Sequence, residues 1–143
     1  MTRTAELRVR IAAPVDDVFD ALTTTDGLSG WWTTLVSGSS SRGGQLRFEF
    51  EGVAETITMR VDEAIRPRRL TWHCLGHSGQ AEWAGTRLMF DLEDCEAETE
   101  LSLQHEGIAP ELVEPGWQHF LRSLTAHVEH GQGMPFGSDD GMP

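Results

Sequence analysis

The chain has 143 residues, 38% of them hydrophobic, which suits a single domain with one core. Its formal net charge is −12 and all 11 basic residues are arginine, so nucleic acid and anionic membrane surfaces are poor partners. No apolar run is long enough to cross a bilayer and the N-terminus lacks the apolar core of a signal peptide, so we expect a cytoplasmic protein.

The first part of the chain is predicted to hold one strand and two short helices. Residues 5–11 alternate strictly between aliphatic and charged side chains, which indicates a half-buried strand. Pro14 begins a first helix, because a proline in the first turn of a helix loses no hydrogen bond. A second short helix is capped within residues 24–26 and runs to Trp32.

After a flexible loop at residues 37–44, the pattern returns to period two and predicts a run of about six strands. Each strand has apolar side chains on one face only, which is typical of an antiparallel sheet with one face in water. The inward positions are Leu46, Phe48 and Phe50; Ile57, Met59 and Val61; Leu70, Trp72 and Cys74; Leu88, Phe90 and Leu92; and Thr99, Leu101, Leu103 and His105.

The last predicted element is a long helix, because residues 112–128 carry apolar side chains at helical spacing and Gly131 provides a stop. Residues 132–143 are rich in Gly, Pro and Asp, so we expect a flexible tail after a single domain at residues 1–131. A sheet with one apolar face and a helix with a broad apolar stripe must cover each other. The predicted fold class is therefore α+β: an antiparallel β-sheet curled around a long C-terminal helix, with two short helices after the first strand.

Five segments in this order carry a resemblance to a known family. They are IAAPVDDVFDAL at residues 11–22, GWW at 30–32, WAGTRLMF at 83–90, LSLQHEG at 101–107 and GWQHFL at 116–121. Together they resemble the SRPBCC superfamily, whose members are START-like and birch-pollen-allergen-like, and more narrowly the branch named after the activator of 90-kDa heat-shock protein ATPase. The resemblance covers roughly residues 5 to 131, and it rests on the ordered set rather than on one motif.

The resemblance implies a helix-grip fold whose sheet and long helix often enclose an apolar cavity. Members of the superfamily bind lipids, hormones or polyketides, and a minority are cyclases, dehydratases or hydrolases. Eukaryotic chaperone activators join this kind of domain to a separate N-terminal domain, for which this chain has no room. We therefore do not expect a chaperone partner, and we leave a homodimer open.

Most candidate ligand-binding residues are large apolar side chains on the faces that must meet. Trp31 and Trp32 are a separate case, since a double Trp after a Gly and near a loop forms either a pocket lip or a staple between the short helix and the sheet. Five Trp and six Phe are a heavy aromatic load for a small domain, and ligand sites are mostly apolar and aromatic. Plain core packing is the alternative for each residue taken singly. The candidates are Trp31, Trp32, Phe48, Phe50, Met59, Trp72, Phe90, His105, Trp117, Phe120, Leu121 and Leu124.

His105 is the one polar candidate, because it continues the inward series of the last strand. A neutral imidazole there would fix a ligand's orientation or move a proton, whereas the alternative is a histidine that is hydrogen-bonded to a nearby loop. The sequence contains no nucleophile elbow, phosphate-binding loop or dinucleotide fingerprint. We therefore assign no catalytic residue and no cofactor, and we lean against an enzyme.

The histidines and cysteines do not predict a metal site. His73 and Cys74 are adjacent in a strand and point to opposite faces, while His127 and His130 lack a second pair of ligands. Cys74 and Cys95 are expected to be free thiols, because a disulfide framework normally needs more cysteines.

Three functions follow, in order of preference. The first is binding of a small, largely apolar molecule in a cavity between the curved sheet and the C-terminal helix. The second is a protein-interaction domain like that of the chaperone activators, which an exposed apolar patch outside the cavity would favour. The third is a small cyclase, dehydratase or hydrolase centred on His105, which a buried contact between His105 and a carboxylate would favour.

Overall fold

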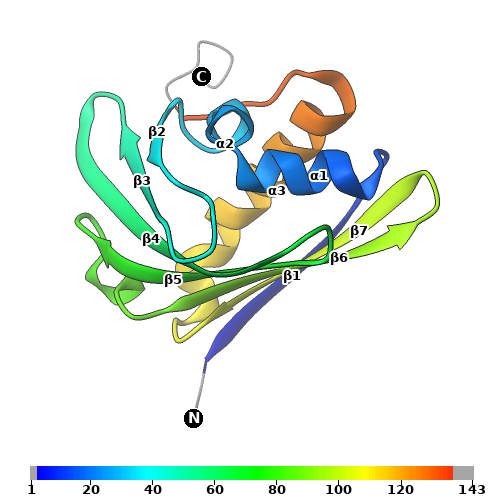
Figure 1. Cartoon of the computed structure of the whole chain (residues 1–143). Helices are drawn as coiled ribbons and strands as arrows, with labels where there is room; N and C mark the ends of the chain where they lie inside the picture. The colour runs from blue at the N-terminus through cyan, green and yellow to red at the C-terminus, as the bar shows by residue number, and fades with distance from the viewer. Residues whose placement is uncertain (1–2, 137–143) are drawn as a thin grey trace.

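The computed structural model describes residues 3–136 and contains one seven-stranded antiparallel sheet (Figure 1). Its strands lie in the order β1-β7-β6-β5-β4-β3-β2. In chain order the elements are β1 (Thr4–Ile11), α1 (Val15–Thr23), α2 (Thr25–Trp31), β2 (Leu35–Gly38), β3 (Gln45–Phe50), β4 (Val53–Ile65), β5 (Arg69–His77), the short 3-10 helix η1 (Ala81–Trp83), β6 (Arg87–Cys95), β7 (Glu98–Glu106) and α3 (Pro110–His130).

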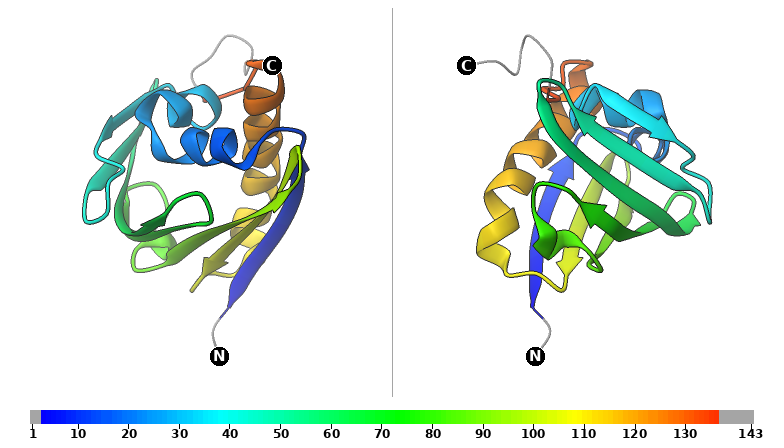
Figure 2. Two further views of the ribbon diagram at one scale, coloured as in Figure 1. Left: turned by 45° about the vertical axis from the view of Figure 1, so that its right-hand side comes forward. Right: turned by 90° about the vertical axis from the view of Figure 1, so that its left-hand side faces the viewer.

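The sheet curls around α3, and α1 and α2 close one end of the molecule beside the C-terminal part of α3 (Figure 2). This confirms the predicted α+β helix-grip arrangement. The core lies between the concave face of the sheet and the helices, and large side chains from both sides, such as Trp72 and Leu124, are fully buried there. Within residues 3–136, no helix combines the length and the apolar composition that crossing a bilayer requires.

Local sequence signals account for the ends of the helices. The Thr24 side chain caps α2 by accepting a hydrogen bond from the backbone N–H of Gly27 at 2.9 Å. Pro110 occupies the first turn of α3, where its missing N–H costs nothing. Gly131 adopts a left-handed conformation with φ of 70° and ends α3, because glycine enters that region without a steric penalty.

Two parts of the chain differ from the sequence-based expectation. The predicted loop at residues 37–44 begins inside strand β2, which pairs with β3 through Val36 and Phe48 among others. Four-residue edge strands carry too short a pattern for periodicity to reveal them. The turn before β6 also contains η1, which the sequence did not indicate.

The segment at residues 132–136, expected to be part of a flexible tail, packs against the body of the domain. The backbone N–H of Met134 donates to Ser123 Oγ at 2.6 Å, and Phe136 forms a bridge with Thr33. Gly133 lies so close to the carbonyl oxygen of Gly30 that a side chain would not fit. Tertiary hydrogen bonds therefore hold this segment in place although its sequence shows no apolar periodicity. The remaining residues of the predicted tail, 137–143, lie outside the described residues.

Candidate functional site

A cavity of about 350 Å³ lies between the N-terminal half of α3 and the β3–β5 side of the sheet. Its wall combines aromatic and aliphatic side chains with a few polar ones. The lining residues are Trp32, Phe50, Glu55, Ile57, His77, Gln80, Trp83, Leu112, Val113, Gly116, Trp117, Phe120 and Phe136. A volume of this size falls within the range of small-molecule sites in proteins.

The helix side of the cavity is one face of α3, since its lining residues recur at spacings of three and four. Gly116 stands in the middle of this face, and a Cβ atom added there would meet nothing within 4 Å. Glycine inside a helix costs about 1 kcal/mol relative to alanine, and here its missing side chain leaves the cavity open.

The sheet side is formed by Phe50, Glu55 and Ile57 and is closed by the turn after β5. In this turn the Trp83 indole donates to Gln80 Oε1 at 3.0 Å. The Trp83 ring lies 5.9 Å from the Trp117 ring, centroid to centroid, so two indoles from distant parts of the chain meet across one end of the cavity.

His105 lies behind this wall and is fully buried. Its Nδ1 accepts a hydrogen bond from Trp117 Nε1 at 3.2 Å, and its Nε2 lies 2.8 Å from Thr86 Oγ1, which in turn donates to the carbonyl oxygen of Trp83. Because Nδ1 is an acceptor and the Thr86 proton is used, Nε2 carries the imidazole proton. Burial lowers the pKa of His105 to about 4, so the ring is neutral at pH 7.

His77 is the histidine that reaches the cavity. Its Nδ1 accepts hydrogen bonds from the backbone N–H groups of Gly79 and Gln80, both at 3.1 Å. Burial lowers the pKa of His77, while the nearby carboxylates of Glu55 and Glu82 oppose that shift. His77 is thus held as a neutral ring at the rim.

The structure divides the twelve predicted ligand-binding residues into two groups. Trp32, Phe50, Trp117 and Phe120 line the cavity. The others lie outside the cavity wall, where neighbouring side chains seal them from the empty space; they are Trp31, Phe48, Met59, Trp72, Phe90, His105, Leu121 and Leu124.

Trp72 illustrates why these residues do not reach the cavity. Its ring stacks on Trp32 with centroids 6.0 Å apart, and it also contacts Phe48 and Phe90. Trp32 therefore stands between the centre of the sheet and the cavity. The Nε1 atom of Trp72 has no hydrogen-bond partner within residues 3–136.

Sequence reasoning did not assign nine of the lining residues to the site. They are Glu55, Ile57, His77, Gln80, Trp83, Leu112, Val113, Gly116 and Phe136. Several lie in turns, near strand ends or beyond the last helix, where periodicity carries no information. One usable signal was the Pro115–Gly116 pair. Proline and glycine both disfavour the interior of a helix, so their presence inside α3 indicates that something other than helix stability determines these two positions.

The possible metal ligands do not converge. No group of three His, Cys, Asp or Glu side chains within the described part of the chain could hold a metal ion. Cys74 and Cys95 are free thiols, and burial raises the pKa of Cys74 to about 11.

Comparison with solved structures gives the same fold. The chain is 29% identical to the Aha1 dimer from Colwellia psychrerythraea, with a TM-score of 0.79, covering 91% of this chain and 98% of that one. For the protein SSP2350 from Staphylococcus saprophyticus the identity is 16%, the TM-score 0.75 and the coverage 91% and 94%. For CalU16 from Micromonospora echinospora the identity is 22% and the TM-score 0.71, covering 91% of this chain and 78% of that one.

The sequence itself also matches a family model. A search of curated proteins found no significant match. Residues 12–129, however, match the model described as activator of Hsp90 ATPase homolog 1-like protein; this range begins just after β1 and ends one residue before the end of α3. The chain therefore belongs to the family of activator of Hsp90 ATPase homolog 1-like proteins.

Proposed function

We propose that the protein binds a small, largely apolar molecule in the cavity between the curved sheet and α3. The observation that carries this proposal is the cavity of about 350 Å³, whose wall includes three indoles, those of Trp32, Trp83 and Trp117. Such a wall offers a large apolar surface with few polar groups, which is the usual composition of a ligand site.

The placement of His105 favours binding over catalysis by that residue. Both of its ring nitrogens are engaged with Trp117 and Thr86, and it contacts no carboxylate among the described residues. Because both ring nitrogens of His105 are hydrogen-bonded to other side chains, neither is free to exchange a proton with a ligand. The hydrogen bond to Trp117 instead fixes the position of that indole at the cavity.

Intrinsic fluorescence is the direct test, because three tryptophans line the cavity. Titration with fatty acids, sterols and aromatic polyketide-like compounds should give a saturable change, with micromolar affinity or better for some member. The absence of a saturable response across the whole library would contradict the proposal.

Gly116→Leu provides a variant that fills the cavity without disturbing the core, since the space at this position is open. It should abolish the saturable response. Gln118→Leu is the matched control, because it adds the same side chain to an exposed position of α3 outside the cavity. Trp72→Phe should keep the response, because this indole lies behind Trp32. Equal binding by Gly116→Leu and wild type would show that ligands bind elsewhere.

A homodimer is the second candidate state, favoured by the relative whose solved structure is that of a dimer. We propose that this chain also associates in pairs. Light scattering behind size-exclusion chromatography should give about twice the monomer mass of 15.9 kDa at high protein concentration. A monomer mass at all concentrations up to the millimolar range would exclude it.

A further inference from the structure

His77 lines the cavity and carries a single ring donor. Its Nδ1 lone pair accepts the backbone N–H groups of Gly79 and Gln80, so the ring proton lies on Nε2. Nε2 makes no hydrogen bond to residues 3–136, although the ring lines the cavity. A donor without a partner at the edge of an apolar site is a position for a ligand acceptor.

The His77 ring is oriented before any ligand arrives. The turn that follows it is tied to β4 through Ser78, whose N–H donates to the carbonyl oxygen of Thr56 at 3.0 Å and whose Oγ accepts the Thr56 N–H at 2.8 Å. The ring also stands edge-on to Trp83, with centroids 5.0 Å apart. A ligand therefore needs to order little of the site to use this donor.

The charge at the same end of the cavity is negative. Glu55 lines the cavity, and its half-buried side chain lies against Gly79, where a Cβ atom would collide with the Glu55 carboxylate. Glu82 also contributes to the field at His77. No arginine is among the lining residues within the described chain. An anionic ligand would therefore meet a carboxylate without a counter-charge.

We propose that the cavity selects an uncharged apolar molecule with a hydrogen-bond acceptor, such as a ketone or ester, which His77 Nε2–H binds while Glu55 excludes carboxylates. This inference rests on the proposed function of the cavity and specifies its ligand class. It excludes fatty acid anions and favours their neutral counterparts.

Three naphthalenes of similar size separate these contributions. 2-Acetylnaphthalene has a carbonyl acceptor, 2-ethylnaphthalene has none, and 2-naphthoate is an anion at pH 7.5. In the wild-type protein the ketone should bind about 5- to 30-fold more tightly than the hydrocarbon, as expected for one additional hydrogen bond. The carboxylate should bind more weakly than the ketone by at least the same factor.

Two variants assign the preferences to their residues. His77→Asn keeps a side-chain acceptor for the turn and removes the Nε2 donor, so the ratio of ketone to hydrocarbon affinity should fall to about one. His73→Asn, on the same strand but outside the cavity, should leave the ratio unchanged. Glu55→Gln removes the charge at constant shape, so the ratio of naphthoate to ketone affinity should rise several-fold.

The outcomes distinguish the ligand class from the function. If ethylnaphthalene binds as tightly as the ketone, or naphthoate binds most tightly of the three, the inference is overturned while ligand binding stands. If none of the three binds and the library of fatty acids, sterols and polyketide-like compounds gives no saturable response either, the proposed function itself is contradicted. If only the library gives a response, the inference alone is overturned. Should His77→Asn fail to fold, the wild-type comparison and Glu55→Gln still decide the matter.

Discussion

The two halves of α3 carry the same apolar stripe but face different surroundings. In the C-terminal half, Leu121 and Leu124 are 4% and 0% exposed, and the helix packs against β1, α1 and α2. In the N-terminal half, Leu112 is 52% exposed and Gly116 carries no side chain, and the helix stands over the cavity. One end of the helix is sealed and the other is open.

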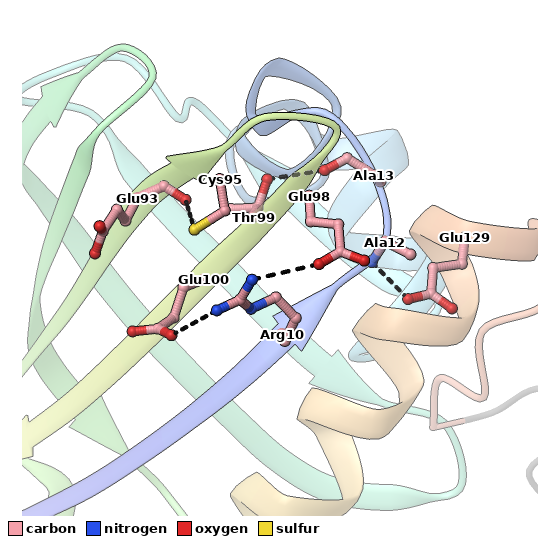
Figure 3. Close-up of polar contacts among 9 residues, drawn as sticks. All are labelled: Arg10, Ala12, Ala13, Glu93, Cys95, Glu98, Thr99, Glu100 and Glu129. Atoms are coloured by element: carbon pink, nitrogen blue, oxygen red, sulfur yellow. Dashed lines mark hydrogen bonds and ion pairs between the residues drawn. The ribbon is translucent and has the colours of Figure 1, made fainter.

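Polar ties hold the sealed end in place (Figure 3). Thr99 Oγ1 donates to the carbonyl oxygen of Ala13 at 2.9 Å, and the backbone N–H of Ala12 donates to the Glu129 carboxylate at 2.7 Å. These contacts join β7, the turn before α1 and the end of α3. Nearby, Arg10 bridges Glu98 and Glu100 on the outer face of the sheet, where exposed ion pairs contribute little.

The comparison teaches that close packing and the cavity lie at opposite ends of one helix. Close packing and buried hydrogen bonds concentrate the free energy of folding where Leu124 and Ser123 are fully buried. The open end relies on aromatic rings that leave space between them. The following predictions test this division, beginning with the largest effect on the free energy of unfolding.

Leu121→Ala should lower the free energy of unfolding by about 3 kcal/mol, because it removes a large side chain from the sealed half and leaves a void. Denaturant titration measures the loss. A change below about 0.5 kcal/mol would show that this half of the stripe is solvated and would remove the contrast between the two ends.

Acidification should weaken folding through His105. Burial lowers the pKa of His105 from 6.5 to about 4 in the folded state, so between these values the unfolded chain binds a proton that the folded chain does not. Stability is therefore lost as the pH falls, by about 2 kcal/mol between pH 7 and pH 5.

The control for this prediction is His105→Gln, which has an amide donor and acceptor but no titration in this range. Its denaturant midpoint should vary less with pH than that of the wild type. Other groups, including His77 and His127, whose pKa values burial also lowers, contribute equally to both curves. Parallel curves for the two proteins would contradict the assignment.

We propose that the folded domain extends to Phe136 rather than ending at Gly131. A chain that ends at Gly131 loses the Met134 hydrogen bond to Ser123 and the contact of Phe136 with Phe50. It should be less stable than a chain that ends at Phe136 by about 1 kcal/mol. Equal melting curves for the two shortened chains would show that residues 132–136 do not contribute to the stability of the domain.

Leu112→Ala should have the smallest effect on folding, below about 0.5 kcal/mol, because its side chain is mostly in water at the open end. The same change should weaken binding of an apolar ligand about threefold, since Leu112 lines the cavity. Fluorescence titration measures the affinity, and denaturation of the same sample measures the free energy of unfolding. A large loss of stability with unchanged ligand affinity would show that the N-terminal half of α3 contributes to folding rather than to binding.

The sequence by itself predicted every element except β2 and η1, together with the faces that the predicted elements bury. Alternation at residues 5–11 and helical spacing at residues 112–128 depend only on neighbours along the chain, and β1 and α3 follow these patterns. The one-sided strands and the single broad stripe on α3 were enough to predict that sheet and helix cover each other. The candidate site was predicted in kind, as an aromatic cavity, and in part, through Trp32, Phe50, Trp117 and Phe120.

Only the tertiary structure decided which inward residues touch empty space. Trp72 and Trp32 both point to the interior, but Trp32 shields Trp72 because the chain stacks one ring over the other. Trp83, in a turn without periodicity, reaches Trp117 across the cavity. The role of His105 likewise depends on Thr86 and Trp117, which are distant in sequence. The hydrogen-bond partners of His77 lie in its own turn, but the cavity wall that it joins is formed by other elements. A cavity is the space left between surfaces that meet only on folding, so no local pattern encodes its boundary.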